Sequence, residues 1–191
     1  MTGAKNSALP LHRHNSSHEA IYVLEGSANL RLNEQEFALE GGDYASVPPG
    51  TAHSLMLTGH RTRLLTWSFG DNGAAMYAAL GQPTEAAIYS SRAEPPDWKK
   101  PLPSVDVEFL PDELPALRPG EKSRVAPAAG VKPYVIPAGE GERMMAGDTL
   151  FAFLTDQRQS GGKFIALMTD APKGQRIPNH LHEKHTRKPS A

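Results

Sequence analysis

The chain has 191 residues, the size of one ordinary domain or slightly more. Its 20 basic and 21 acidic residues nearly balance and form no long run of one sign, so we expect neither a nucleic acid nor a membrane as partner. It has no cysteine, which excludes disulfides and thiolate metal sites, and no signal peptide or membrane-spanning stretch, so we expect a cytoplasmic protein.

The segment 19–69 is predicted to be β structure built from short strands. Turn signals such as Asn33-Glu34 and Pro48-Pro49-Gly50-Thr51 separate its alternating runs. The expected strands are 19–24, 28–32, 35–39, 44–47, 53–57 and 61–69. Short strands at this spacing favour a small antiparallel barrel or sandwich. One short helix is predicted at 74–80, with Gly81 behind it.

The middle of the chain differs in composition from its two ends. Prolines recur between 90 and 130, which predicts a partly extended linker with a candidate strand at 105–110. Strand patterns resume at 134–136, 149–155 and 163–169. We therefore divide the chain into an N-terminal unit at 1–90, a proline-rich linker at 91–130 and a second unit at 131–191.

A histidine cluster opens the first unit. His12 and His14 are two residues apart, so on a strand both imidazoles lie on one face. Glu19 would face the other way on a regular strand, but a bend or bulge at 15–17 returns it to the same face. His53, which follows the turn at 48–51, is the candidate fourth ligand. Three imidazoles and a carboxylate suit a first-row divalent ion with open positions, whereas the competing interpretation is a solvated polar loop.

The remaining candidates near this cluster carry weaker signals. His18 has the wrong parity to join His12 and His14, so we expect it beside the ligands or at the surface. His60 lies in a loop and is expected to be exposed. The apolar residues near the site are interpreted as core residues rather than pocket residues. They are Tyr22, Met56 and Trp67.

The end of the chain repeats its beginning. Residues 173–186 align with residues 5–18 at a constant offset of 168, and His180 and His182 then coincide with the first histidine pair. This repeat indicates two copies of one unit. The glutamate of the second copy would fall at Arg187, so a second metal site at His180 and His182 is expected to be incomplete.

Two motifs resemble those of the cupin superfamily. His12, His14, Glu19 and Gly26 match the first motif, and Gly42, Pro48, Gly50 and His53 match the second. The first glycine of the first motif and the final asparagine of the second are replaced by Asn6 and Leu57. Longer stretches are similar to the two-cupin quercetin 2,3-dioxygenases of bacteria. They are LPLHRHNSSHEAIYVLEG, GGDYASVPPGTAHSLMLTGHRTRLL, KPYVIPAGEGERMMAGDTL and PKGQRIPNHLHEKHT.

This resemblance implies an all-β, cupin-type antiparallel β-barrel, also described as a double-stranded β-helix or jelly roll. It implies one divalent transition metal (Fe, Mn, Ni, Co or Cu) held by His12, His14, Glu19 and His53, with Glu19 acting also as general base. The implied activity is that of an oxidoreductase that cleaves flavonols such as quercetin with O2 and releases carbon monoxide.

The chain departs from this pattern in length. Members of that family hold two complete cupins. This chain is expected to hold one incomplete cupin, which lacks its first strands, followed by the opening strands of a second, truncated cupin. Strands from 131–170 are candidates to complete the first barrel, within the chain or by strand exchange in a homodimer. Three alternatives follow: an active or damaged dioxygenase, another metal-binding cupin such as a small-molecule sensor or isomerase, and a truncated product without a stable site.

Overall fold

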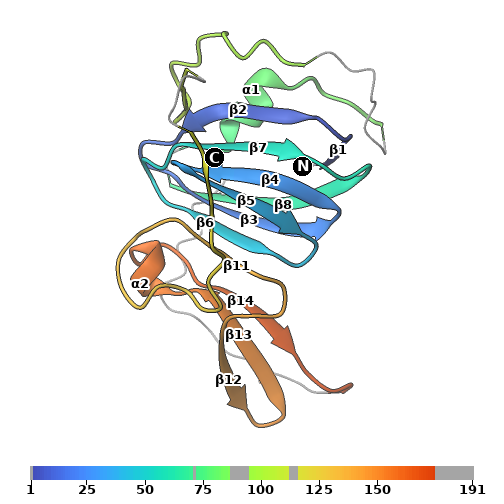
Figure 1. Cartoon of the computed structure of the whole chain (residues 1–191), viewed down its shortest axis with the longest axis vertical. Helices are drawn as coiled ribbons and strands as arrows, with labels where there is room; N and C mark the ends of the chain where they lie inside the picture. The colour runs from blue at the N-terminus through green and yellow to red at the C-terminus, as the bar shows by residue number, and fades with distance from the viewer. Residues whose placement is uncertain (1, 71, 87–94, 112–115, 175–191) are drawn as a thin grey trace, which may run out of the picture.

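The computed structural model describes residues 2–70, 72–86, 95–111 and 116–174, and within them the protein is built almost entirely of β-strands (Figure 1). The first sheet has the order β1 (Thr2–Gly3), β8 (Thr62–Phe69), β3 (His18–Glu25), β6 (Tyr44–Val47) and β11 (Tyr134–Ile136). The second has the order β10 (Arg118–Pro119), β5 (Gln35–Glu40), β4 (Ser27–Leu32), β7 (His53–Leu57), β2 (Ala8–Arg13) and β9 (Glu108–Phe109). Neighbouring strands are antiparallel except for the parallel pair β10 and β5.

The main core lies between these two sheets. Side chains alternate along a strand, so one face of each sheet is apolar and meets the other. In β4, for example, Ala28, Leu30 and Leu32 are buried while the residues between them are half-buried. The first sheet contributes Ile21, Val23, Ala45, Val47 and Leu64 to the same cluster, and the second contributes Leu9, Phe37, Leu39, Leu55 and Leu57. The polar cluster described below lies between the strands of these two sheets.

The glycine that closes the first motif allows a close approach of two loops. Gly26 connects β3 to β4 with a positive φ of 82°, which side chains with a Cβ rarely adopt. A Cβ at this position would lie 2.2 Å from the carbonyl oxygen of Arg61. The motif glycine is therefore required by backbone conformation and by space, independently of any chemistry at the site.

The described part of the proline-rich stretch packs on the first unit. β9 pairs with β2, and β10 pairs with the edge of β5. The side chains of this stretch that pack against the main core are Trp98, Leu102, Val105, Val107 and Phe109. The candidate strand at 105–110 thus corresponds to the short strand β9. The division into domains at 90 and 130 stays a prediction.

The C-terminal part forms a sheet of its own, with β12 (Glu142–Ala146), β13 (Thr149–Thr155) and β14 (Ala166–Asp170) in that order. It lies at the opposite end of the molecule from α1 (Ala75–Leu80) (Figure 1). A short helix, α2 (Gln157–Ser160), follows β13. Of the strands expected to complete the first barrel, β11 does pair with β6, whereas β12, β13 and β14 do not join the first two sheets.

A second buried cluster joins the outer face of the first sheet to β13. Ala20, Tyr44, Tyr134, Ile136 and Leu154 form its apolar part. The hydroxyl of Thr155 lies 2.6 Å from the hydroxyl of Tyr44 and 2.6 Å from that of Tyr134. Both faces of the first sheet are therefore covered in this region, which explains why β6 is buried at every position.

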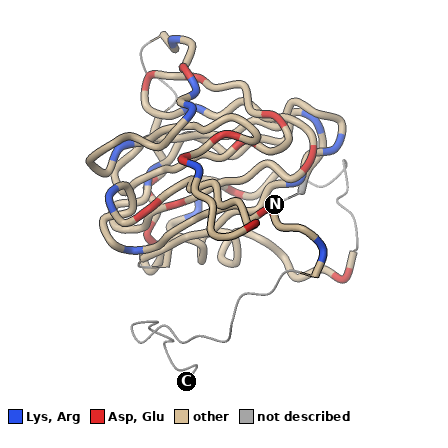
Figure 2. Tube along the Cα trace, turned by 90° about the horizontal axis from the view of Figure 1, so that it is seen from below, with Lys and Arg blue, Asp and Glu red and all other residues tan. Residues whose placement is uncertain are grey.

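Most predicted elements agree with the structure. The expected strands at 44–47, 53–57 and 134–136 coincide with β6, β7 and β11, and the expected helix at 74–80 is α1. Lysine, arginine, aspartate and glutamate are interspersed along the described chain (Figure 2). In the part of the chain that the structure describes, no helix is both long and apolar enough to cross a membrane.

Candidate metal centre

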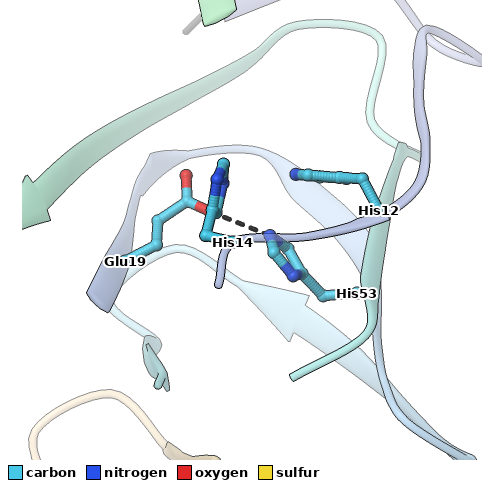
Figure 3. A group of neighbouring side chains, drawn as sticks. All are labelled: His12, His14, Glu19 and His53. Carbon is cyan, nitrogen blue, oxygen red and sulfur yellow. Dashed lines mark hydrogen bonds and ion pairs between the residues drawn. The ribbon is translucent and has the colours of Figure 1, made fainter. Parts of the chain in front are cut away.

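Four side chains from three strands and one loop converge inside the first unit. His12 comes from β2, His14 from the residue after it, Glu19 from β3 and His53 from β7 (Figure 3). Their exposed fractions are 0%, 5%, 3% and 2% in that order. One ligand atom from each lies within 4.8 Å of the others, so the four residues can hold one metal ion.

The backbone brings these residues together in the way that the sequence predicts. β2 ends at Arg13, and the chain bends at Asn15 and Ser16 before β3 begins, so the parity between His14 and Glu19 is broken. His12 and His53 face each other across the antiparallel pair β2 and β7. The His180 and His182 pair, predicted for a second site, lies outside the described residues.

Gly50 of the second motif makes a backbone contact with the first motif. Gly50 has a positive φ of 79°, and its backbone N–H donates to the carbonyl oxygen of His14 at 2.7 Å. This bond fixes the loop at 48–51 against the end of β2. The two sequence motifs are therefore joined by backbone contact as well as by the shared site.

Each imidazole is oriented by a backbone carbonyl. Nδ1 of His12 lies 2.8 Å from the carbonyl oxygen of Pro10, and Nδ1 of His53 lies 2.9 Å from that of Thr51. Nδ1 of His14 contacts the carbonyl oxygen of Asp106. A carbonyl accepts a hydrogen bond, so Nδ1 carries the hydrogen and the lone pair of Nε2 is left for a metal ion.

Two further observations fit a cation at the centre of the cluster. Nε2 of His12 is buried and has no hydrogen-bond partner. Nε2 of His53 and Oε2 of Glu19 are 3.0 Å apart, so two of the candidate ligand atoms already lie close together. An unpaired buried nitrogen is costly, and a metal ion would satisfy it. The donor set of three nitrogens and one carboxylate suits a transition metal.

The surroundings favour the protonation states that metal binding needs. Burial, and then the charge of His53, lower the pKa of His12 from 6.5 to about 3, so this imidazole is neutral at pH 7. Burial alone would raise the pKa of Glu19, but its close contact with His53 and the other neighbouring imidazoles outweigh burial and lower that pKa. Glu19 is therefore ionised and can act as a ligand.

A cavity of about 430 Å³ opens onto the cluster from the side of α1. His14 and Glu19 form its polar end, and Leu64, Leu65 and Tyr77 are among its apolar walls. The hydroxyl of Tyr77 donates to Oε1 of Glu19 at 3.4 Å. Burial and the Glu19 carboxylate raise the pKa of Tyr77, so this hydroxyl keeps its proton. Sequence reasoning missed Tyr77, although it predicted the helix that carries it.

Two expectations about neighbouring residues were wrong. His18 lies neither at the surface nor among the ligands: it is fully buried on the outer face of β3, where Nε2 lies 2.8 Å from the hydroxyl of Ser46 and Phe164 packs edge-on against the ring. Met56 and Trp67 are not core residues, with exposed fractions of 41% and 39%. Strand alternation places both on the faces that point away from the main core. Tyr22 is half-buried against the second cluster.

Comparisons with known proteins are consistent with this fold. Residues 1–68 match the protein family described as a cupin domain, and this segment holds the four side chains. The chain is similar to quercetin 2,3-dioxygenase from Bacillus subtilis (strain 168), with 35% identity over 190 residues, or 97% of this chain and 56% of that protein. The chain thus spans about half the length of this relative.

Two solved structures show weaker likeness. A Pseudomonas aeruginosa protein described as glyoxylate induced has a TM-score of 0.44 and 17% identity, covering 81% of this chain and 41% of its own. Oxalate decarboxylase from Bacillus subtilis, solved at pH 4.6, has a TM-score of 0.41 and 16% identity, covering 85% of this chain and 45% of its own. Neither likeness is close enough to carry an argument about activity.

Proposed function

We propose that this protein is a metal-dependent oxidoreductase that cleaves flavonols such as quercetin with O2 and releases carbon monoxide. The observation that carries the proposal is the cluster of His12, His14, Glu19 and His53 at the end of a largely apolar cavity. The similarity to a quercetin 2,3-dioxygenase supports the choice of substrate. Because the chain spans only part of that relative, the activity of this chain is what the experiments below must establish.

The four residues would hold one divalent transition metal (Fe, Mn, Ni, Co or Cu) through three Nε2 atoms and the Glu19 carboxylate. When bound, such an ion supplies Lewis acidity and open positions at which a substrate hydroxyl and O2 are brought together. The protein itself orients the ligand atoms. The carbonyl groups of Pro10 and Thr51 keep the hydrogens of His12 and His53 on Nδ1, which aims both Nε2 atoms at the centre.

Glu19 has two oxygens with different surroundings, and this difference gives it two roles. Oε2 lies among the imidazoles, 3.0 Å from Nε2 of His53 and 3.7 Å from Nε2 of His14. Oε1 accepts the hydrogen bond from Tyr77 beside the cavity. We assign Oε2 to metal binding and Oε1 to accepting the proton of the flavonol 3-hydroxyl, as a general base.

The cavity has the size of a small-molecule site. Its volume of about 430 Å³ falls within the range of about 300–1,000 Å³ typical of small-molecule sites. Leu64, Leu65, Ala74 and Tyr77 are among the residues that line it, and His14 and Glu19 are among its polar residues.

A second candidate function uses the same four ligands. A cupin that binds a small molecule as a sensor, or that isomerises it, needs the metal and the cavity but consumes no O2. The apolar cavity is compatible with this function as well. Consumption of flavonol with release of carbon monoxide favours the dioxygenase, and binding without turnover favours the sensor.

The first experiment measures metal per chain. The protein is produced with mixed divalent metals and compared with His12→Ala and His53→Ala, and His60→Ala serves as the control because His60 is an exposed histidine away from the cluster. We expect about one equivalent in the unchanged chain and the control, and loss in both ligand variants. Flavonol absorbance and carbon monoxide are then followed on the loaded protein. Metal that survives both ligand variants would reject the assigned site.

The domain organisation is part of the proposal. We propose an N-terminal cupin at 1–90, a connecting segment at 91–130 and the start of a second cupin at 131–191, supported by the separate sheet of β12, β13 and β14. A homodimer formed by strand exchange stays a prediction, which light scattering of the purified chain would test.

A further inference from the structure

The loop that separates His14 from Glu19 is held by a single distant carboxylate. Oδ1 of Asp106 accepts the backbone N–H of Asn15 at 2.8 Å. Oδ2 accepts the backbone N–H of Ser16 at 3.1 Å, that of Ser17 at 2.7 Å and the hydroxyl of Ser16 at 2.9 Å. Three successive N–H groups that point at one anion form a typical backbone anion site, which here is filled from within the chain.

The same residue also orients a proposed metal ligand. The backbone carbonyl of Asp106 accepts the hydrogen bond from Nδ1 of His14. This contact places the hydrogen on Nδ1 and leaves Nε2 facing Glu19 at 3.7 Å from Oε2. Asp106 therefore touches the loop through its side chain and the ligand through its main chain.

The position of Asp106 is itself fixed by neighbouring contacts. Immediately after it, β9 pairs with β2, with Glu108 opposite Arg13 and Phe109 opposite His12. Arg13 and Glu108 also form an ion pair at 2.8 Å. The segment that carries Asp106 thus lies against the strand that carries the first ligand, and a displacement of either one displaces the other.

The bend at Asn15–Ser17 needs this support because it is what breaks the strand parity. A regular strand would turn Glu19 away from His14. Bent backbone leaves N–H groups without strand partners, and such groups must find another acceptor. On the other side of the loop, Nζ of Lys163 donates to the carbonyl oxygen of Ser16 at 2.8 Å. The loop is therefore held from both sides by the second half of the chain.

From these contacts we propose that Asp106 is a positioning residue of the metal centre, which fixes the bend that lets His14 and Glu19 bind one ion. The inference rests on the proposed metal site, but the contacts that carry it are protein contacts that the structure shows directly. Asp106 does not touch the ion or the substrate. It acts through the orientation of His14 and the path of the loop.

The test compares Asp106→Asn and Asp106→Ala with Asp97→Asn in the full chain. Asp97 lies in the same segment, but its carboxylate accepts from the backbone N–H of Lys99 rather than from the loop. Co²⁺ affinity is measured by competition with a chelator, and the visible spectrum of bound Co²⁺ reports ligand geometry. We expect affinity to fall about 10-fold to 100-fold and the spectrum to change in both Asp106 variants. The control is expected to match the unchanged chain.

A readout without metal separates this inference from the proposed function. The ¹⁵N shifts of the His14 ring report which nitrogen carries the hydrogen. We expect the Nδ1–H form in the metal-free unchanged chain and a mixture of forms in Asp106→Ala. Should the unchanged chain bind no metal, this result would uphold the positioning role while the proposed function fails. Unchanged affinity, spectrum and ring shifts in Asp106→Asn would overturn the inference, and that variant decides if Asp106→Ala does not fold.

Discussion

Protonation of His12 in the metal-free chain is expected to destabilise the fold. This imidazole is fully buried, its Nδ1 donates to the carbonyl oxygen of Pro10, and its Nε2 has no partner. Burial, followed by the charge of His53, lowers its pKa from 6.5 to about 3. A proton added to Nε2 would place an unpaired charge in the interior, so the folded state resists a proton that the unfolded state accepts.

The sign and size of the effect follow from this difference. Above pH 6.5 both states carry neutral His12 and the group contributes nothing to the pH dependence. As the pH falls below 6.5 the unfolded state binds the proton first, so stability is lost until the pH reaches about 3. With about 1.4 kcal/mol for each pH unit, the loss between pH 7 and pH 5 is about 2 kcal/mol.

The assay is urea unfolding of the chelator-treated chain at pH 7, 6 and 5. His12→Gln removes the titrating group while keeping a polar side chain of similar size, and His60→Gln is the control at an exposed histidine. The free energy of unfolding of the unchanged chain should fall by about 2 kcal/mol more than that of His12→Gln between pH 7 and pH 5. His60→Gln should follow the unchanged chain.

Equal pH dependence in the unchanged chain and in His12→Gln would refute the reasoning. It would mean that Nε2 of His12 reaches water or another acceptor in the metal-free protein. The neutral, preorganised imidazole that the proposed metal site requires would then be absent before the ion arrives.

Two further predictions test the surroundings of the site. Tyr77→Phe removes the hydroxyl that donates to Oε1 of Glu19 and keeps the ring at the cavity wall, so kcat/KM for flavonol cleavage should fall about threefold to tenfold while metal content stays the same. Thr155→Val removes the hydroxyl shared by Tyr44 and Tyr134, so the free energy of unfolding in urea should fall by about 1–3 kcal/mol while metal content stays the same. Thr84→Val, at an exposed threonine, should leave both quantities unchanged.

Local signals in the sequence predict several of the observed strands. The apolar runs and turn residues at β6, β7 and β11 place these strands at their observed bounds, because each signal lies within a few residues of the strand. β12 was missed because its sequence, ERMMA, neither alternates nor favours a strand, and all five residues are exposed. This segment is a strand because it pairs with β13, not because its own residues favour a strand.

The residues of the site likewise include some that the sequence predicts and some that it does not. The positions of His12, His14 and Glu19 follow from strand parity and a bend at small polar residues, which the sequence shows directly. Tyr77 could not be found, because the face of α1 that meets the cavity depends on how the helix docks. Asp106 gives no local signal either, since its partners in the loop lie 89 to 91 residues away.

The three histidines therefore differ in what holds them. The rings of His12 and His53 are oriented by carbonyl groups only two residues away, so any chain that forms β2 and β7 also forms these contacts. The ring of His14 is oriented by a carbonyl 92 residues away, in a segment that its composition predicts to be a linker. A fragment that keeps both cupin motifs but lacks this segment would keep four ligand residues and lose the support of one. The two motifs thus identify the ligand residues, whereas a preorganised site also depends on the segment that carries Asp106.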